Sequence, residues 1–258
     1  MTVYAPAMPW LQPPADALDR LDRLLERADG RARTFFRADD IGLPSAGFAS
    51  LVETFIRHRT PLALAVVPVW LPMRQAELER QLASGGSLWF LHQHGFRHVS
   101  HEPAEPSPKK SEFGPSRPAE AKRRNIARGR DILEQRLGHR FRPMFTPPWN
   151  RCDAETLEAL ASLGFRAVSR SQGARPSAPP GLAELPVSVD LHTRKEPTAE
   201  AALDALLAEL EQGLTSGPCG IMIHHQRMNR AALEFLDHLL AGLKQHGLRV
   251  AHPAELLP

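Results

Sequence analysis

Aspartates and histidines recur in this sequence of 258 residues at spacings that suit metal-assisted hydrolysis. Asp39 and Asp40 follow the apolar stretch RTFFRA, and the segment HQHGFRH carries His94 and His98 four residues apart. Two neutral imidazoles and one carboxylate form a three-ligand site with an open position for water, which is typical of catalytic zinc centres. The ion would lower the pKa of that water toward ~7. One aspartate can then bind the ion, while its neighbour, kept ionised by the positive charge, takes the proton from the water.

Further polar residues stand at the ends of other apolar segments and could complete such a site. They are His92 in HQHGFRH, Pro148, Trp149 and Asn150 in TPPWN, Asp190 and His192 in VDLH, and His224 and His225 in IMIHH. Each of these residues could also have an ordinary structural role. The same holds for Asp39 and Asp40, because an Asp-Asp pair before glycine is common in turns. With 12 histidines in the chain, about half a pair at i, i+4 is expected by chance. A site is favoured because all these segments would end at the same side of one sheet.

The segments that carry these residues alternate with predicted helices. Apolar stretches over 33–38, 61–69, 87–93, 140–148, 165–170, 184–192 and 219–225 predict strands, and amphipathic stretches over 46–59, 73–83, 118–137, 153–164, 199–214 and 229–247 predict helices. Such alternation predicts an α/β protein with right-handed crossovers and a parallel sheet. Seven or eight strands suit a barrel, so we expect one domain over residues 1–258. Ligands of such folds bind at the carboxyl ends of the strands, where the polar residues stand.

Composition and charge argue against several classes of protein. The hydrophobic content of 42% suits one sizeable core, and 32 Lys+Arg against 29 Asp+Glu leave a net charge of only +3. We therefore expect no nucleic-acid partner and no membrane partner. Two isolated cysteines and the absence of a secretory signal predict a cytoplasmic location. The sequence carries no signal for an oligomeric state.

The motifs resemble those of the polysaccharide deacetylase superfamily (NodB-homology, similar to carbohydrate esterase family 4). RADDIG, HQHGFRH, TPPWN and IMIHH stand in the order of the family's motifs and span residues 37 to 225. The resemblance implies a distorted (β/α) barrel with about seven parallel strands. It implies a metal-dependent hydrolase that acts on carbon–nitrogen bonds other than peptide bonds and removes an acetyl group from a sugar or related small amide, by N-deacetylation or O-deacetylation. The implied cofactor is one divalent metal, with zinc as the expected ion.

The resemblance also implies roles for individual residues. Asp39 would be the general base and His224 the general acid, and Asp40, His94 and His98 would bind the metal. Asp190 stands where the family has an aspartate that tunes the acid. Substrate-binding or supporting roles fall to His92, Pro148, Trp149, Asn150, His192, His225 and Arg117. Glu112 and Arg117 lie in the loop after the third strand and either contact substrate or hold that loop in place.

The chain departs from the family pattern at two positions. The family's third motif usually carries an arginine that orients the base, and Thr146 stands there; Arg37, Arg151 or Lys195 could replace it. The acid motif usually continues from histidine into aspartate, whereas this chain continues into His225, so either His224 or His225 could face the site.

Two alternatives stay open. One is a non-catalytic sugar-binding or metal-binding descendant of the same barrel, which the missing arginine favours. The other is a barrel enzyme of the chitooligosaccharide deacetylase type, against which the close pair His94 and His98 speaks. Without a secretory signal, a soluble sugar, a nucleotide-linked or lipid-linked sugar, or another small amide is a more plausible substrate than a cell-wall polymer.

Overall fold

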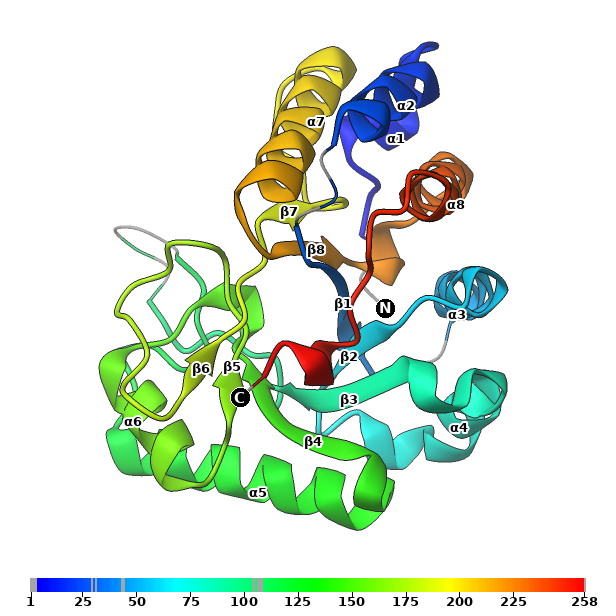
Figure 1. The fold of residues 1–258 in the computed structure, drawn as a ribbon. Helices are drawn as coiled ribbons and strands as arrows, with labels where there is room; N and C mark the ends of the chain where they lie inside the picture. Colours follow the sequence, from blue (N-terminus) through cyan, green and yellow to red (C-terminus); the bar gives the residue numbers. More distant parts are fainter. Residues whose placement is uncertain are drawn as a thin grey trace.

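Eight parallel strands form the central sheet, in the order β6-β5-β4-β3-β2-β1-β8-β7 (Figure 1). The structure is a computed structural model that describes residues 4–28, 30, 32–42, 45–103, 105 and 109–257. The strands are β1 Thr34–Ile41, β2 Leu62–Val66, β3 Trp89–His94, β4 Phe141–Thr146, β5 Ala167–Val168, β6 Ala183–Glu184, β7 Val189–Asp190 and β8 Cys219–Ile223. Every pairing is parallel, which confirms the predicted α/β class and parallel sheet.

One short segment joins the two edges of this sheet. The predicted strand over 184–192 is divided into β6 and β7, which stand at opposite ends of the strand order although they follow each other in the sequence. The Leu185 N–H donates to the Val168 carbonyl beyond β6 (2.9 Å), and the Ser188 N–H donates to the Gly220 carbonyl of β8 (2.8 Å). Because β6 and β7 belong to one extended segment, the sheet forms a distorted barrel of about seven strands, as predicted.

The helices that connect the strands cover the outside of the sheet (Figure 1). They are α3 Ala46–His58, α4 Gln75–Leu82, α5 Ala119–Leu137, α6 Ala154–Ser162, α7 Ala199–Ser216 and α8 Arg230–Gln245. All six were predicted, and each end lies within two residues of its predicted position. Ser45, Asp153, Thr198 and Asn229 begin four of them, each accepting a hydrogen bond from the backbone N–H three residues on. These caps satisfy donors that the first turn of a helix leaves free.

Side chains on the inner face of the strands fill the barrel in layers. The lowest layer is apolar and buried, and its members come from successive strands: Phe35, Ala63, Phe90, Met144 and Ala167. Because side chains alternate along a strand, the residues two and four positions further along also face the interior. On β1 these residues are Arg37 and Asp39. The barrel therefore becomes polar toward the carboxyl ends of its strands.

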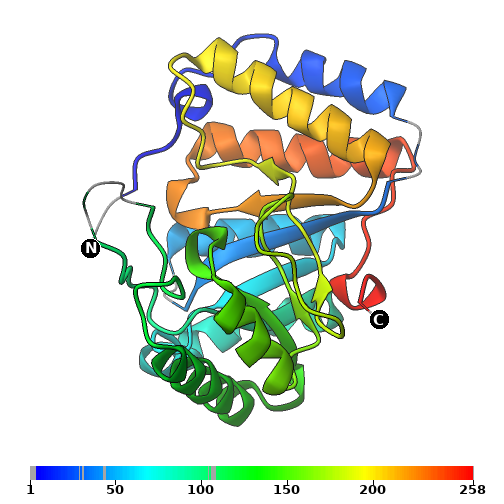
Figure 2. The ribbon, with the colours of Figure 1, turned by 90° about the vertical axis from the view of Figure 1, so that its left-hand side faces the viewer.

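Two helices at the N-terminus lie outside the predicted alternation of strands and helices. They are α1 Met8–Leu11 and α2 Ala17–Arg27, and Figure 2 shows α2 beside α7 at one end of the molecule. Trp10 of α1 is 3% exposed, its indole N–H donates to the Leu191 carbonyl (2.8 Å), and its ring lies 5.1 Å from that of Phe235. Among the described residues, none of the helices has the length and apolar character needed to cross a membrane.

We expect Trp10→Ala to lower the free energy of unfolding by about 3–5 kcal/mol, since it leaves a cavity and an unpaired Leu191 carbonyl. Leu11→Ala, on the same short helix but with 53% of the leucine exposed, is the control and should change stability by no more than about 0.5 kcal/mol. Urea unfolding followed by circular dichroism measures both. Equal effects of the two substitutions would show that α1 is not anchored through Trp10.

Candidate functional site

A bulge at the end of β1 brings both aspartates to one cavity. The predicted strand ended at residue 38, but β1 continues through Asp39 and Asp40 to Ile41. From Ala38 to Ile41 the strand advances three residues while β2 advances two, and Asp40 has a φ of 63°. Neighbouring residues of a regular strand point to opposite faces, and the extra residue removes that alternation. Both carboxylates therefore line a cavity of about 710 Å³ at the carboxyl ends of the strands.

The three predicted metal ligands lie together in this cavity. His94 Nε2 is 3.3 Å and His98 Nε2 is 3.1 Å from Asp40 Oδ1, and one ligand atom from each residue lies within 4.8 Å of the other two. Burial favours the neutral carboxyl, but His94 and His98 outweigh it and hold the pKa of Asp40 far below its usual range. Asp40 is therefore an ionised carboxylate between two imidazoles.

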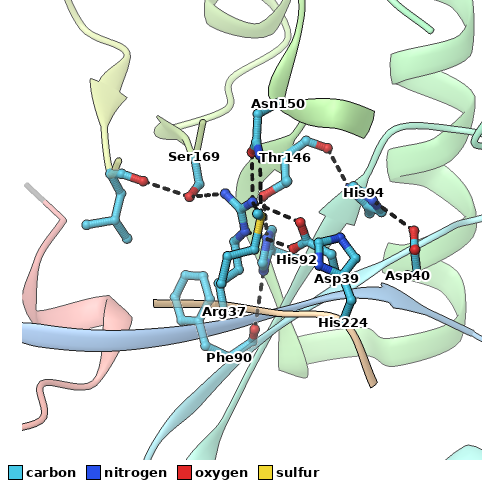
Figure 3. Close-up of polar contacts among 12 residues, drawn as sticks. Arg37, Asp39, Asp40, Phe90, His92, His94, Thr146, Asn150, Ser169 and His224 are labelled. Atoms are coloured by element: carbon cyan, nitrogen blue, oxygen red, sulfur yellow. Dashed lines mark hydrogen bonds and ion pairs between the residues drawn. The ribbon is translucent and has the colours of Figure 1, made fainter. Parts of the chain in front are cut away.

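The hydrogen bonds around this cluster fit a bound cation. His94 Nδ1 lies 3.0 Å from the Thr146 carbonyl, so Nδ1–H donates there and the Nε2 lone pair faces Asp40 (Figure 3). Apart from its contacts with His94 and His98, the buried Asp40 Oδ1 has no hydrogen-bond partner among the described residues. A buried carboxylate oxygen placed between two imidazole nitrogens, with no other donor, is suited to a divalent metal ion.

Asp39 is held separately, by a buried guanidinium group. Arg37, on the same face of β1, is fully buried and donates to both Asp39 oxygens, with distances of 2.8 Å from Nε and 2.8 Å from Nη2. Its remaining N–H groups donate to Ser169 Oγ (2.7 Å) and Asn150 Oδ1 (2.7 Å) (Figure 3). Burial would raise the pKa of Asp39, but the charge of Arg37 lowers it below the usual value. Asp39 is thus ionised and fixed in orientation.

Arg37 is therefore the residue that orients Asp39, a contact for which the sequence left Arg37, Arg151 and Lys195 as candidates. Arg151 instead donates to the Lys110 carbonyl (3.2 Å). At the position of the family's arginine, Thr146 lies 2.8 Å from His92 Nε2. His92 Nδ1 faces the Phe90 carbonyl (3.4 Å), so we assign the hydroxyl as donor to Nε2. Burial and the charge of Arg37 lower the pKa of His92 to about 3, which keeps this imidazole neutral beneath the site.

The loop that carries His98 is fixed by a buried carboxylate. Glu112 accepts hydrogen bonds from the backbone N–H groups of Phe96 (3.1 Å), Arg97 (2.7 Å) and His98 (3.1 Å). Arg117 donates to the Glu112 carbonyl (3.2 Å). The sequence left open whether Glu112 and Arg117 contact substrate or hold the loop. Their contacts hold the loop, and neither residue lines the cavity. Glu112 thereby determines where His98 stands.

The two adjacent histidines after β8 point in different directions. His224 lines the cavity, and its Nδ1 has no hydrogen-bond partner among the described residues. His225 is buried, with Nε2 3.3 Å from the Asp40 carbonyl and Nδ1 3.3 Å from Ser45 Oγ. Its ring packs against that of Phe48 at 5.3 Å. His224 is therefore the histidine that faces the site, and His225 supports the bulge that places Asp40.

Asp190 and His192 stand beside His224 without the contact that the family pattern suggested. The Asp190 carboxylate accepts from the backbone N–H groups of His192 (3.0 Å) and Thr193 (2.9 Å) and from the Thr193 hydroxyl. Asp190 lines the cavity, but the hydrogen bonds of its carboxylate stay within its own turn. His192 is buried, and its Nδ1 accepts from the backbone N–H of His224 (3.1 Å). These residues position the backbone of His224.

The segment TPPWN forms one wall of the site. A short turn over Pro148–Asn150 follows β4, and Trp149 and Asn150 have φ values of 57° and 58°. The Trp149 ring lies 4.5 Å from the His98 ring, and Asn150 binds Arg37 as described. Pro148 packs so closely on Gly95 that a Cβ there would lie 2.5 Å from it. Ser169, which accepts a hydrogen bond from Arg37, was not predicted to belong to the site, although its position just after β5 is typical of a site residue.

Comparisons with known proteins agree with this fold. No family model matches the sequence, and no curated protein matches it. Solved structures do match: a family 4 acetyl xylan esterase from Clostridium thermocellum in complex with a cobalt ion has a TM-score of 0.58 at 14% identity, covering 86% of this chain and 89% of that chain. A candidate polysaccharide deacetylase from Mycobacterium smegmatis has a TM-score of 0.57 at 18% identity, covering 99% and 93%.

A third match is a pseudoenzyme of carbohydrate esterase family 4 from Bacillus anthracis, with a TM-score of 0.57 at 13% identity, covering 87% of this chain and 64% of that chain. At such identities the likeness is one of fold. The chain has the fold of the polysaccharide deacetylases of carbohydrate esterase family 4, as its motifs led us to expect.

Proposed function

We propose that this protein is a metal-dependent hydrolase that removes an acetyl group from an acetylated sugar or a related small amide. The observation that carries the proposal is that two adjacent aspartates make different contacts. A buried oxygen of Asp40 faces the Nε2 atoms of both His94 and His98, while both oxygens of Asp39 are held by Arg37. One carboxylate is placed to bind a cation and the other to accept a proton.

Asp40, His94 and His98 would hold the metal. When bound there, a divalent ion supplies a Lewis acid for the acetyl carbonyl and lowers the pKa of water. A site of one carboxylate and two imidazoles suits zinc, and we propose zinc as the ion. The fold relative from Clostridium thermocellum was solved with a cobalt ion.

The remaining residues would move the protons of the hydrolysis. Asp39, ionised beside Arg37, accepts a proton from the attacking water as the carbon–oxygen bond to the acetyl carbon forms. His224, which faces the same cavity, donates a proton to the leaving nitrogen or oxygen as its bond to that carbon breaks. Water is consumed, and acetate and the free amine or alcohol are released. Arg37 is a positioning residue, since it acts through Asp39.

The same residues bear on the alternative of a non-catalytic descendant. The pseudoenzyme from Bacillus anthracis shows that this fold also occurs without activity. In this chain, however, Asp39 and His224 line the cavity, the cluster of Asp40, His94 and His98 could hold a metal ion, and Arg37 makes the contact with Asp39 that Thr146 cannot make. These contacts favour an enzyme. One catalytic domain over the chain and a cytoplasmic location belong to the same proposal.

We expect purified protein to bind about one zinc ion per chain and His94→Ala or His98→Ala to abolish binding, because each removes one of three ligands. His101→Ala, an exposed histidine in the same segment, is the matched control and should keep the ion. Mass spectrometry of the metal content after dialysis measures all four proteins. Retention of zinc by both His94→Ala and His98→Ala would contradict the site.

We expect Asp39→Asn to retain the metal and to lose about 10²–10⁴-fold in kcat on acetylated substrates, because the amide cannot accept the proton. Acetate release from a panel of acetylated sugars measures activity, and metal content is followed in parallel. Loss of the ion together with activity would assign Asp39 to the ligands and refute its role as base.

We expect Arg37→Lys to lower kcat by about 10²-fold with KM changed by less than about threefold, since an ammonium group cannot bind both oxygens of Asp39 and the base loses its orientation. Arg57→Lys on α3, where the arginine is 60% exposed, is the control. Steady-state kinetics on one acetylated substrate, with metal content unchanged, is the test. An unaltered kcat would mean that Arg37 only stabilises the fold.

A further inference from the structure

Positively charged side chains surround the cavity that holds Asp40, His94 and His98. Four of them line it: Lys110, Arg151, Lys195 and Arg227. They come from four separate loops, which follow β3, β4, β7 and β8. The charges therefore converge on the cavity from different sides of the barrel. We call these four residues the cationic rim.

The cationic rim has no ion-pair partner among the described residues. Arg151 donates to the Lys110 carbonyl (3.2 Å), and Arg227 donates to the Ala5 carbonyl (3.1 Å); these contacts position the guanidinium groups and leave their charge uncompensated. Elsewhere on the surface, arginines pair with acids, as Arg20, Arg57, Arg130, Arg140, Arg230 and Arg249 do. Some other arginines, such as Arg59, Arg80 and Arg142, also have no ion pair among the described residues, so the cationic rim is distinguished by the convergence of four unpaired cations on one cavity.

The acidic residues of the same cavity are already engaged. Asp39 is paired with Arg37, and Asp40 lies between the two imidazoles. Glu209 accepts from the Arg194 guanidinium (2.6 Å). Asp190 is taken up by the donors of its own turn. None of these carboxylates neutralises the cationic rim, which leaves it for a ligand.

A second cavity adjoins the first, and its own charges balance. This cavity, of about 650 Å³, shares Trp149, Asn150, Arg151 and Ser171 with the first. Its basic residues Lys109, Arg151 and Arg175 stand against the acidic residues Glu102, Glu105 and Asp153, so the excess of unpaired positive charge belongs to the first cavity. The chain has only five lysines, and three of them, at positions 109, 110 and 195, lie around the two cavities. A ligand that reaches the metal ligands therefore passes or contacts basic groups.

We propose that the substrate is an acetylated sugar that carries an anionic group, either a phosphate or a carboxylate, bound by the cationic rim. This inference rests on the proposed deacetylase function. Guanidinium and ammonium groups form charge-assisted hydrogen bonds with both anions, and arginine can bind either one through two N–H groups. With the anion on the rim, the acetyl group can lie at Asp40, His94 and His98, and the positive field also raises the rate of encounter.

The test compares acetate release by the metal-loaded protein from four sugars. N-acetylglucosamine and di-N-acetylchitobiose are neutral, N-acetylglucosamine 1-phosphate carries a phosphate, and N-acetylmuramic acid carries a carboxylate. We expect at least one anionic sugar to exceed both neutral sugars in kcat/KM by about tenfold or more at low salt, and the preference to shrink in 0.5 M NaCl, since salt screens exposed charges. The two anionic sugars show which anion is preferred.

Charge-removing variants test the residues themselves. Lys110→Gln with Lys195→Gln should raise KM for the preferred anionic sugar about three- to tenfold and leave hydrolysis of the neutral sugars within about twofold. Lys244→Gln, an exposed lysine on α8, is the matched control. Equal or better hydrolysis of neutral sugars, or an unchanged KM in the double variant, would overturn the inference and leave the deacetylase function standing. Acetate release from none of the sugars would instead refute the deacetylase function, and the inference with it.

Discussion

The buried ion pair between Arg37 and Asp39 is the interaction on which the candidate site depends. Both groups lie in the barrel interior, with Arg37 fully buried and Asp39 3% exposed, where an unpaired charge would be strongly unfavourable. The guanidinium group satisfies both oxygens of Asp39 and is itself bound by Ser169 and Asn150. The charge of Arg37 disfavours a second cation at Asp39, and Asp40 is the carboxylate that lies beside His94 and His98.

The barrel supplies this pair through its alternation of side chains. Phe35 belongs to the apolar layer of the interior, Arg37 lies in the polar layer above it, and Asp39 reaches the cavity. The bulge then turns Asp40 to the same side, with its backbone carbonyl near His225. The two neighbouring carboxylates thus have different surroundings, because the strand directs Asp39 toward Arg37 and the bulge directs Asp40 toward the imidazoles. These surroundings suit Asp39 to accept a proton and Asp40 to bind a cation.

Much of this was predictable from the sequence because the signals are local. The periodicity of apolar residues located seven segments that overlap the eight strands, together with six helices, and the motif HQHGFRH placed His94 at the end of β3 and His98 in the loop after it. The choice of Arg37 over Arg151 or Lys195 could not be predicted, because it depends on which side chains share the interior of the closed barrel. The end of β1 was wrongly predicted at residue 38. The strand continues through a bulge, and a bulge depends on the pairing with β2, which the sequence does not reveal. The Asp190 carboxylate does not contact His224 as the family pattern suggested, because it accepts hydrogen bonds from the backbone N–H groups of His192 and Thr193 instead.

The most direct test of the account is a crystal structure of the zinc-loaded protein with anomalous scattering recorded on both sides of the zinc absorption edge. We expect one zinc peak bound by Asp40, His94 and His98, with both Asp39 oxygens still held by Arg37. A zinc ion bound by Asp39, or a peak away from these three residues, would contradict it, because the two aspartates would then not have the separate roles that the hydrolysis requires.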